Sequence, residues 1–120
     1  MLPSVIKSVS SAHGMNVAYI SPDGKKITYK ELDVISDEMA VWLRNERISE
    51  GSVVGLSLPS CIEYIVSYIA LAKVGAITAG INPRFTSRER LKTLRTLDPN
   101  VVITAKGYDD GVGDQYRKTL

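Results

Sequence analysis

Few side chains of this 120-residue protein could do chemistry, since it has one cysteine, Cys61, and one histidine, His13. Cys61 falls at the predicted start of a helix, a position that favours the thiolate. A nucleophilic thiol also needs a base such as histidine, and His13 lies in a stretch with no predicted element. His13 alone cannot make a metal site. We therefore expect a structural Cys61, and a single cysteine excludes an internal disulfide.

Cation and phosphate sites have little support in the sequence. Asp109, Asp110 and Asp114 lie close together, but they lack the spacing of an EF-hand loop and its closing glutamate. A solvated loop is the simpler interpretation. Neither a P-loop nor a G-x-G-x-x-G element occurs, and Gly111-Val112-Gly113 has aspartates beside it that would repel phosphate. We expect this segment to bind no metal and no cofactor.

The composition indicates one soluble domain. Its 15 basic and 13 acidic residues give a net charge of +2, without the basic stripe that a nucleic-acid partner needs. The longest apolar region, residues 62–81, is interrupted by Glu63 and Lys73. The uncharged run between these two charges, residues 64–72, is shorter than the roughly 20 residues that a membrane-spanning helix needs. With no signal peptide in sight, we expect a cytoplasmic protein without a transmembrane segment.

Residues 21–24 have turn chemistry and are predicted to join two short strands into a hairpin. Three helices follow, at about residues 29–45, 61–74 and 87–97. Each has a possible capping box at its start, a hydroxyl residue followed three positions later by glutamate. These pairs are Thr28/Glu31, Ser60/Glu63 and Thr86/Glu89. The paired side chains would satisfy backbone N–H groups that the first helical turn leaves free.

Apolar periodicity indicates which helix faces are buried. The first helix has an apolar stripe typical of a core-facing amphipathic helix. Its members are Leu32, Ile35, Met39, Trp42 and Leu43. The second helix is apolar on nearly all sides, so we expect it to be buried on more than one face.

Short apolar strands alternate with these helices, at residues 53–58, 77–81 and 101–105. Such alternation predicts a parallel sheet with right-handed crossovers. The strands scarcely alternate polar and apolar residues, as expected when both faces of a sheet are covered. We predict an α/β fold: a hairpin and a helix, then a βαβαβ unit. Residues 1–105 form the domain, and residues 106–120 are expected to be a loop or a frayed tail.

Several of these segments form a recognisable succession. They are Ile27-Thr28-Tyr29-Lys30-Glu31-Leu32, Gly51-Ser52-Val53-Val54-Gly55-Leu56, Leu58-Pro59-Ser60, Ala70-Leu71-Ala72-Lys73-Val74-Gly75-Ala76 and Asn82-Pro83. The succession resembles the amino-terminal signature of the adenylate-forming (AMP-dependent) superfamily, which includes acyl-CoA synthetases, adenylation domains and luciferases. The resemblance covers about residues 17–104. Two positions depart from the family pattern: glycine is common at Arg47 and aspartate at Ser52.

The resemblance implies a fold and an activity. The fold would be the first subdomain of the large domain of these ligases. The segment Asn82-Pro83-Arg84-Phe85-Thr86 looks more like the acyl-CoA synthetases than the amino-acid-activating adenylation domains. Such a parent, a ligase of fatty acid metabolism, would use ATP and Mg²⁺ to turn a carboxylic acid into an acyl-adenylate. The thiol of CoA would then displace AMP.

The resemblance also implies that the segment does not work alone. The family holds ATP phosphates with a Ser/Thr/Gly-rich loop that contains a lysine, and no such run occurs here. We expect an N-terminal fragment, inactive by itself, with no catalytic, cofactor-binding or metal-binding residue among residues 1–120. Loops near Arg84, Arg88 and Lys106 approach the CoA nucleotide in some relatives, but a solvated basic face explains these cations more simply.

Other functions remain open from the sequence. The segment could be one half of a split ligase, with the remainder of the ligase as its partner, or a non-catalytic interaction module. A small α/β nucleotide binder is a third alternative, which the missing glycine-rich turn disfavours. An exposed sheet edge would also allow self-association.

Overall fold

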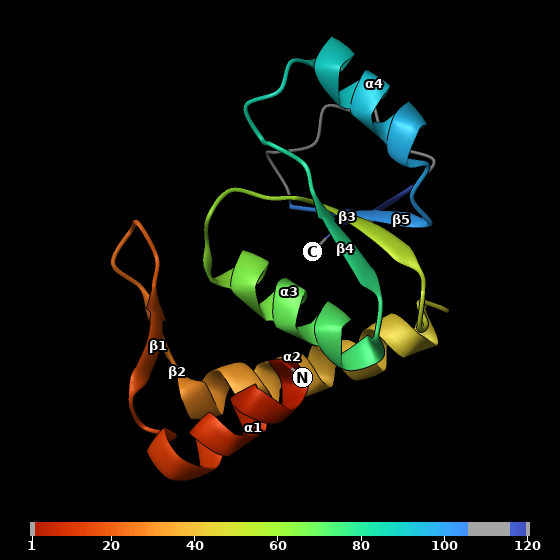
Figure 1. Ribbon diagram of the computed structural model, residues 1–120. Helices are drawn as coiled ribbons and strands as arrows, with labels where there is room; N and C mark the ends of the chain where they lie inside the picture. The colour runs from red at the N-terminus through yellow and green to blue at the C-terminus, as the bar shows by residue number, and fades with distance from the viewer. Residues whose placement is uncertain (1, 106–115, 120) are drawn as a thin grey trace.

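The computed structural model describes residues 2–105 and 116–119, which form four helices and six strands (Figure 1). In chain order they are α1 (Leu2–His13), β1 (Val17–Ile20), β2 (Lys26–Thr28), α2 (Tyr29–Asn45), β3 (Val53–Ser57), α3 (Ile62–Val74), β4 (Ile77–Gly80), α4 (Ser87–Leu97), β5 (Val101–Thr104) and β6 (Arg117–Thr119). Strands β1 and β2 pair as an antiparallel hairpin. The other four strands form a parallel sheet in the order β4-β3-β5-β6.

The order of the strands places helices on both faces of the sheet. The crossover through α3 leads from β3 to β4 on one side, and the crossover through α4 returns past β3 to β5 on the other. Crossovers of one hand that run in opposite directions put their helices on opposite faces. Figure 1 shows α4 on one side of the sheet and α2 and α3 on the other. The α/β class, the hairpin and the βαβαβ unit are therefore confirmed.

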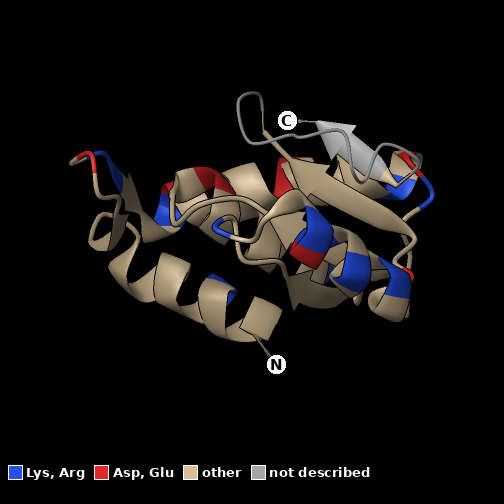
Figure 2. Cartoon of the chain, turned by 90° about the horizontal axis from the view of Figure 1, so that it is seen from above, with Lys and Arg blue, Asp and Glu red and all other residues tan. Residues whose placement is uncertain are grey.

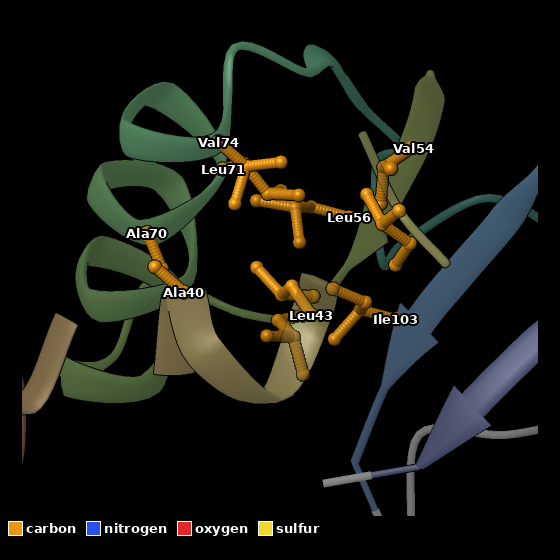
Figure 3. Close-up of a cluster of buried hydrophobic side chains, with 10 residues drawn as sticks. Ala40, Leu43, Val54, Leu56, Ala70, Leu71, Val74 and Ile103 are labelled. Carbon is orange, nitrogen blue, oxygen red and sulfur yellow. The ribbon is translucent and has the colours of Figure 1, made fainter. Parts of the chain in front are cut away.

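The main core lies between the sheet and the layer formed by α2 and α3 (Figure 3). Its ten buried residues come from both helices, the loops that follow α2 and β3, and strands β3 and β5: Ala40, Leu43, Ile48, Val54, Leu56, Leu58, Ala70, Leu71, Val74 and Ile103. On the opposite face, the cluster formed by the described residues has three buried members, Ile81, Leu94 and Val102, packed against Phe85 and Tyr116. Because apolar burial is the main stabilising contribution, the α2–α3 face contributes most to holding this fold together.

Two of the three predicted capping boxes are confirmed. At the start of α2, Glu31 N donates to Thr28 Oγ1 over 3.1 Å and Thr28 N donates to Glu31 Oε1 over 3.0 Å. Thr86 and Glu89 repeat this arrangement at α4. The prediction for α3 is wrong: this helix begins one residue later, its N-cap is Cys61, and no side chain caps it. With Cys61 at that position, a glutamate at 63 is one residue too early to close a box.

Two elements were not predicted. Helix α1 buries only Ile6, so its apolar pattern is too sparse to stand out. Strand β6 lies within the stretch expected to be a loop or frayed tail, where it pairs with β5 and aligns Val102 with Arg117. Pairing at a sheet edge uses backbone hydrogen bonds, so the strand needs no apolar alternation. Residues 106–115 and 120, which include Lys106 and the three aspartates, lie outside the described residues.

The backbone of the connection after α2 shows why glycine suits the position of Arg47. Arg47 is exposed and has a φ of 66°, in the left-handed region. A side chain is strained in that conformation, whereas glycine adopts it freely. A glycine at this site therefore has a physical reason. Among the described helices, none combines the length and the apolar character that crossing a bilayer requires.

Candidate functional site beside helix α2

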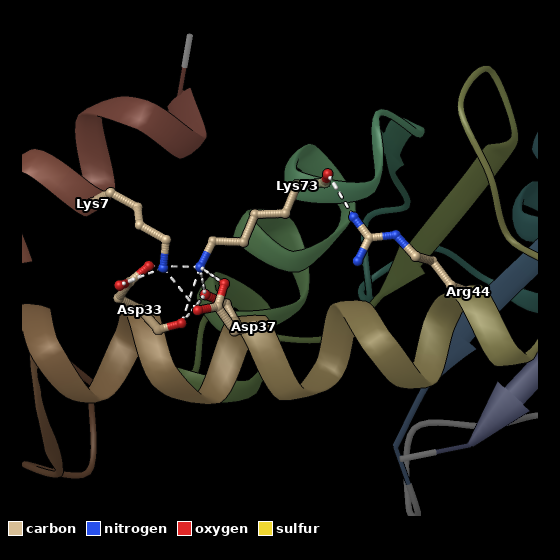
Figure 4. Close-up of polar contacts among 6 residues, drawn as sticks. Lys7, Asp33, Asp37, Arg44 and Lys73 are labelled. Atoms are coloured by element: carbon tan, nitrogen blue, oxygen red, sulfur yellow. Dashed lines mark hydrogen bonds and ion pairs between the residues drawn. The ribbon is translucent and has the colours of Figure 1, made fainter.

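A cluster of four charged residues joins three helices on one flank of α2 (Figure 4). Asp33 and Asp37 lie one turn apart on α2, Lys73 comes from α3, and Lys7 comes from α1. We call these four residues the ion cluster. Lys73 Nζ donates to Asp33 Oδ1 and Asp37 Oδ1, each over 2.7 Å. Lys7 Nζ donates to Asp33 Oδ2 over 3.0 Å and Asp37 Oδ2 over 2.8 Å. Every carboxylate oxygen of the cluster therefore has a lysine partner.

The inner half of the ion cluster is buried. The side chains of Lys73 and Asp33 are 7% and 11% exposed, whereas those of Lys7 and Asp37 are 57% and 47% exposed. Lys73 also donates to Ser36 Oγ over 2.8 Å, and Ser36 in turn donates to the Asp33 carbonyl over 3.1 Å. A buried charge needs both a counter-charge and hydrogen bonds, and Lys73 has them. The two lysines neutralise the two aspartates, and their ion pairs connect α1 and α3 to α2.

The pKa values reflect this pairing. Burial acts to raise the pKa of the Asp33 carboxyl, but hydrogen bonds from Lys73 and Lys7 more than offset it, and the pKa lies below its ordinary value. Hydrogen bonds from Lys7 and Lys73 likewise lower the pKa of Asp37. The hydrogen bonds that Lys7 donates to Asp37 and Asp33 raise the pKa of Lys7. Asp33, Asp37 and Lys7 thus stay charged at neutral pH, and neither carboxylate is poised to act as a general base.

Sequence reasoning missed the ion cluster, although two signals pointed to it. Asp33 and Asp37 have the i, i+4 spacing that places them on one helix face. Lys73 interrupts a helix that is otherwise apolar, and a charge in such a helix requires a buried partner. The identity of that partner, 36 to 40 residues away in the chain, is not visible in a local pattern.

The residues that sequence analysis weighed for chemistry do not come together. Cys61 is half-buried at the N-terminus of α3, where burial raises the pKa of its thiol. His13 is exposed at the end of α1. Within the described ranges, no three His, Cys, Asp or Glu side chains group so that they could hold a metal ion. Arg84 and Arg88 are exposed, and Figure 2 shows basic and acidic segments interspersed along the ribbon.

The other flank of α2 is an apolar groove shared with α3, of about 690 Å³. From α2 it is lined by Ile35, Glu38, Met39 and Trp42, and from α3 by Ile62, Glu63, Val66 and Ser67. We call this surface the α2–α3 groove. Ile35 was expected in the core because it shares the apolar stripe of α2, but it is 42% exposed. The stripe is wider than the surface that the described residues cover.

A family model for AMP-binding enzyme matches residues 7–119 of the chain. Among curated proteins, 4-coumarate--CoA ligase 1 from Petroselinum crispum is 33% identical over 91 residues. The aligned part is 76% of this chain but 17% of that relative. The chain therefore spans about one sixth of the length of the curated relatives it matches.

Solved structures share the fold. The N-terminal subdomain of Klebsiella oxytoca NpsA, in complex with 3-hydroxybenzoyl-AMSN, superimposes with a TM-score of 0.84 at 25% identity, covering 98% of this chain and 29% of that one. A putative long-chain-fatty-acid CoA ligase from Rhodopseudomonas palustris gives a TM-score of 0.89 at 23% identity, covering 99% and 32%. The second likeness concerns the fold alone.

Proposed function

The chain belongs to the AMP-binding enzyme family, and from this premise we propose that it is the N-terminal part of the large domain of an adenylate-forming acid–thiol ligase. The observation that carries the proposal is the family match over residues 7–119. The parent would join a carboxylic acid to ATP, giving an acyl-adenylate and pyrophosphate, and then transfer the acyl group to the thiol of CoA. We propose residues 1–105 as the subdomain unit.

The relatives bear on the class of acid. The fatty acid expected from the resemblance has support only from a likeness of fold, the putative long-chain-fatty-acid CoA ligase. The curated sequences that match include 4-coumarate--CoA ligases from several plants. We therefore propose an aromatic carboxylic acid of the 4-coumarate type as the first substrate to test, with fatty acids second.

We propose ATP, Mg²⁺ and CoA as the cofactors and co-substrate of the parent, and no cofactor site in this segment. The paired carboxylates of Asp33 and Asp37 could suggest a Mg²⁺ site. All four of their oxygens instead accept hydrogen bonds from Lys7 and Lys73, whose charges balance theirs. The proposed role of this segment is therefore to support the domain, with α2 and α3 held in register on the sheet.

The test uses the full polypeptide that contains these residues, recovered from its source with an antibody against the Tyr29–Asn45 segment. Exchange of labelled pyrophosphate into ATP should require an added carboxylic acid, with 4-coumarate giving the largest rate. The 120-residue chain purified alone is the control and should give no exchange. Exchange by the chain alone would overturn its assignment as an inactive part.

The size of the recovered polypeptide separates the alternatives. A polypeptide several-fold larger than this chain, inactive with both aromatic and fatty acids, would overturn the proposed function. A stable polypeptide of this size with a co-purifying partner would indicate a split ligase if the mixture catalyses the exchange. If that mixture does not catalyse exchange, the segment is an interaction module.

A further inference from the structure

The α2–α3 groove is an apolar surface on the two helices that form one side of the main core. Ile35 is 42% exposed on one side, and Met39 and Trp42 are half-buried beside it. Exposed apolar patches that are rimmed by polar residues mark interaction sites. The neighbouring side chains already form the main core, so an occupant of this groove would extend that core.

A buried hydroxyl group lies in the wall of the groove. Ser67 is 0% exposed, and its Oγ has no hydrogen-bond partner among the described residues. Leaving a buried hydroxyl unpaired is unfavourable, and native structures rarely do so.

The rim of the groove is acidic on both sides. Glu38 on α2 and Glu63 on α3 are exposed, and neither forms an ion pair within the described part of the chain. The ion cluster shows the opposite situation, because both of its carboxylates are paired. Two carboxylates without an ion-pair partner, one from each helix that lines an apolar groove, complement an apolar stripe with cations on its flanks.

Two solved chains with this fold are about three times as long as this one, since it covers 29% and 32% of them. Most of such a chain is thus available to cover this face. We propose that the α2–α3 groove is the docking site for an amphipathic helix from the remainder of the adenylate-forming domain, with an apolar stripe flanked by Lys or Arg. This inference rests on the proposed function.

The exposure of the groove favours a helix over a small ligand. Pockets for small molecules enclose 70–90% of the ligand surface, whereas a groove with Ile35 still 42% exposed is open along one side. Helices that dock in such grooves use anchors spaced i, i+3, i+4 and i+7. Docking a third helix on α2 and α3 would complete the burial of the apolar stripe predicted from the sequence.

Trp42 makes the test direct, because it lines the groove and is the sole tryptophan of the chain. The probes are peptides of about 20 residues, enough for roughly 30 Å of helix. They tile the part of 4-coumarate--CoA ligase 1 from Petroselinum crispum that lies outside its alignment with this chain. We expect one peptide, or two that overlap, to shift Trp42 emission to the blue with one-to-one saturation, and its sequence to carry the Lys- or Arg-flanked apolar stripe.

Matched variants locate the binding. Ile35→Lys should weaken the peptide by roughly tenfold or more, because it places a cation in the apolar floor. Val41→Lys is the control: Val41 is on the same helix and 56% exposed, but it does not line the groove. Glu38→Lys should also weaken binding, and a peptide with its flanking Lys changed to Glu should recover it. Both Ile35 and Glu38 are exposed, so these variants should fold.

Each other outcome overturns the inference. If no peptide shifts the emission, or if Ile35→Lys and Val41→Lys behave alike, the groove is not a helix site. A blue shift that grows with protein concentration alone would identify a second copy as the occupant. A shift caused by 4-coumarate or decanoate without peptide would identify a small-molecule site. Because acid-dependent exchange by the full polypeptide does not depend on this assay, exchange without peptide binding would reject the inference and leave the proposed function standing.

Discussion

The two flanks of helix α2 reverse the usual distribution of polar and apolar groups. On one flank Asp33 is buried, with its side chain 11% exposed. On the other flank Ile35 is 42% exposed. The difference arises because the described residues provide partners for one flank of α2 and no cover for the other. Lys7 and Lys73 come from α1 and α3 and neutralise the buried carboxylates, whereas no described element lies over the α2–α3 groove.

The comparison shows that a polar contact can be complete in a segment whose apolar surface is not. A buried charge is tolerated only with its partner in place, so the ion cluster must be formed from residues that fold together. An apolar patch can remain exposed at a moderate cost, because exposed apolar surface is common on folded proteins. We therefore expect substitutions on the two flanks to differ in their effect on stability.

The largest effect should come from Lys73→Met. This change keeps the apolar stem but leaves Asp33 buried without its closest cation. Breaking a buried pair by removing one partner costs about 3–5 kcal/mol, and we expect a decrease in the free energy of unfolding near the lower end, since Lys7 still contacts both carboxylates. Urea unfolding followed by circular dichroism measures it, with the exposed Lys92→Met as the control. Equal urea midpoints for the two variants would mean that the ion cluster does not stabilise the fold.

Acid should weaken the same flank. The folded-state pKa values of Asp33 and Asp37 are lowered below the unfolded value of about 3.9. The unfolded chain therefore binds protons first, so the stabilisation is present above about pH 4 and is lost as pH falls through the folded pKa values. Urea midpoints should decrease from neutral to acid pH, more steeply than in the Asp33→Asn/Asp37→Asn double variant.

The double variant also serves as the control for this titration. Glu31 and Glu89 have lowered pKa values as well, because they accept backbone hydrogen bonds in the capping boxes. They are present in both proteins, so the difference between the two pH curves isolates the ion cluster. Parallel curves would show that the cluster contributes nothing to the acid sensitivity.

Lys7→Met should have a smaller effect than Lys73→Met. The Lys7 side chain is 57% exposed, and exposed ion pairs contribute little because water and salt screen them. We expect a small decrease in Tm that disappears in 1 M salt, where the screening length is about 3 Å. A decrease in Tm as large as that of Lys73→Met, and insensitive to salt, would contradict this expectation. It would show that the ion pairs of Lys7 on α1 stabilise the fold as much as those of Lys73.

The smallest effect should come from Ile35→Lys in the α2–α3 groove. Substitutions at exposed positions usually change stability by less than about 0.5 kcal/mol. Leu43→Ala on the same helix is the comparison, because Leu43 is 0% exposed and such a truncation costs about 3 kcal/mol. Chemical unfolding of both variants measures the contrast. A large loss in Ile35→Lys would show that the groove is closed in solution.

Much of the fold could be predicted because its signals are local. The limits of α2 and α4 agree with the predicted residues 29–45 and 87–97, since each begins with a hydroxyl residue and a glutamate at capping distance. Gly75 takes a φ of 84° at the C-cap of α3, a conformation that glycine adopts readily. The error at Ser60 was also local, because a one-residue change in helix start removes the box.

What the sequence by itself determined is the set of elements whose backbone preferences and apolar periodicity suffice to define them: the hairpin, the three main helices and the parallel strands. Only the tertiary structure decided that Lys73 pairs with Asp33, 40 residues away in the chain, and that Lys7 of α1 pairs with the same carboxylate. It also decided that Ile35 faces an open groove. The physical reason is that periodicity tells which side of a helix is apolar or charged, whereas burial depends on which distant element comes to lie against that side.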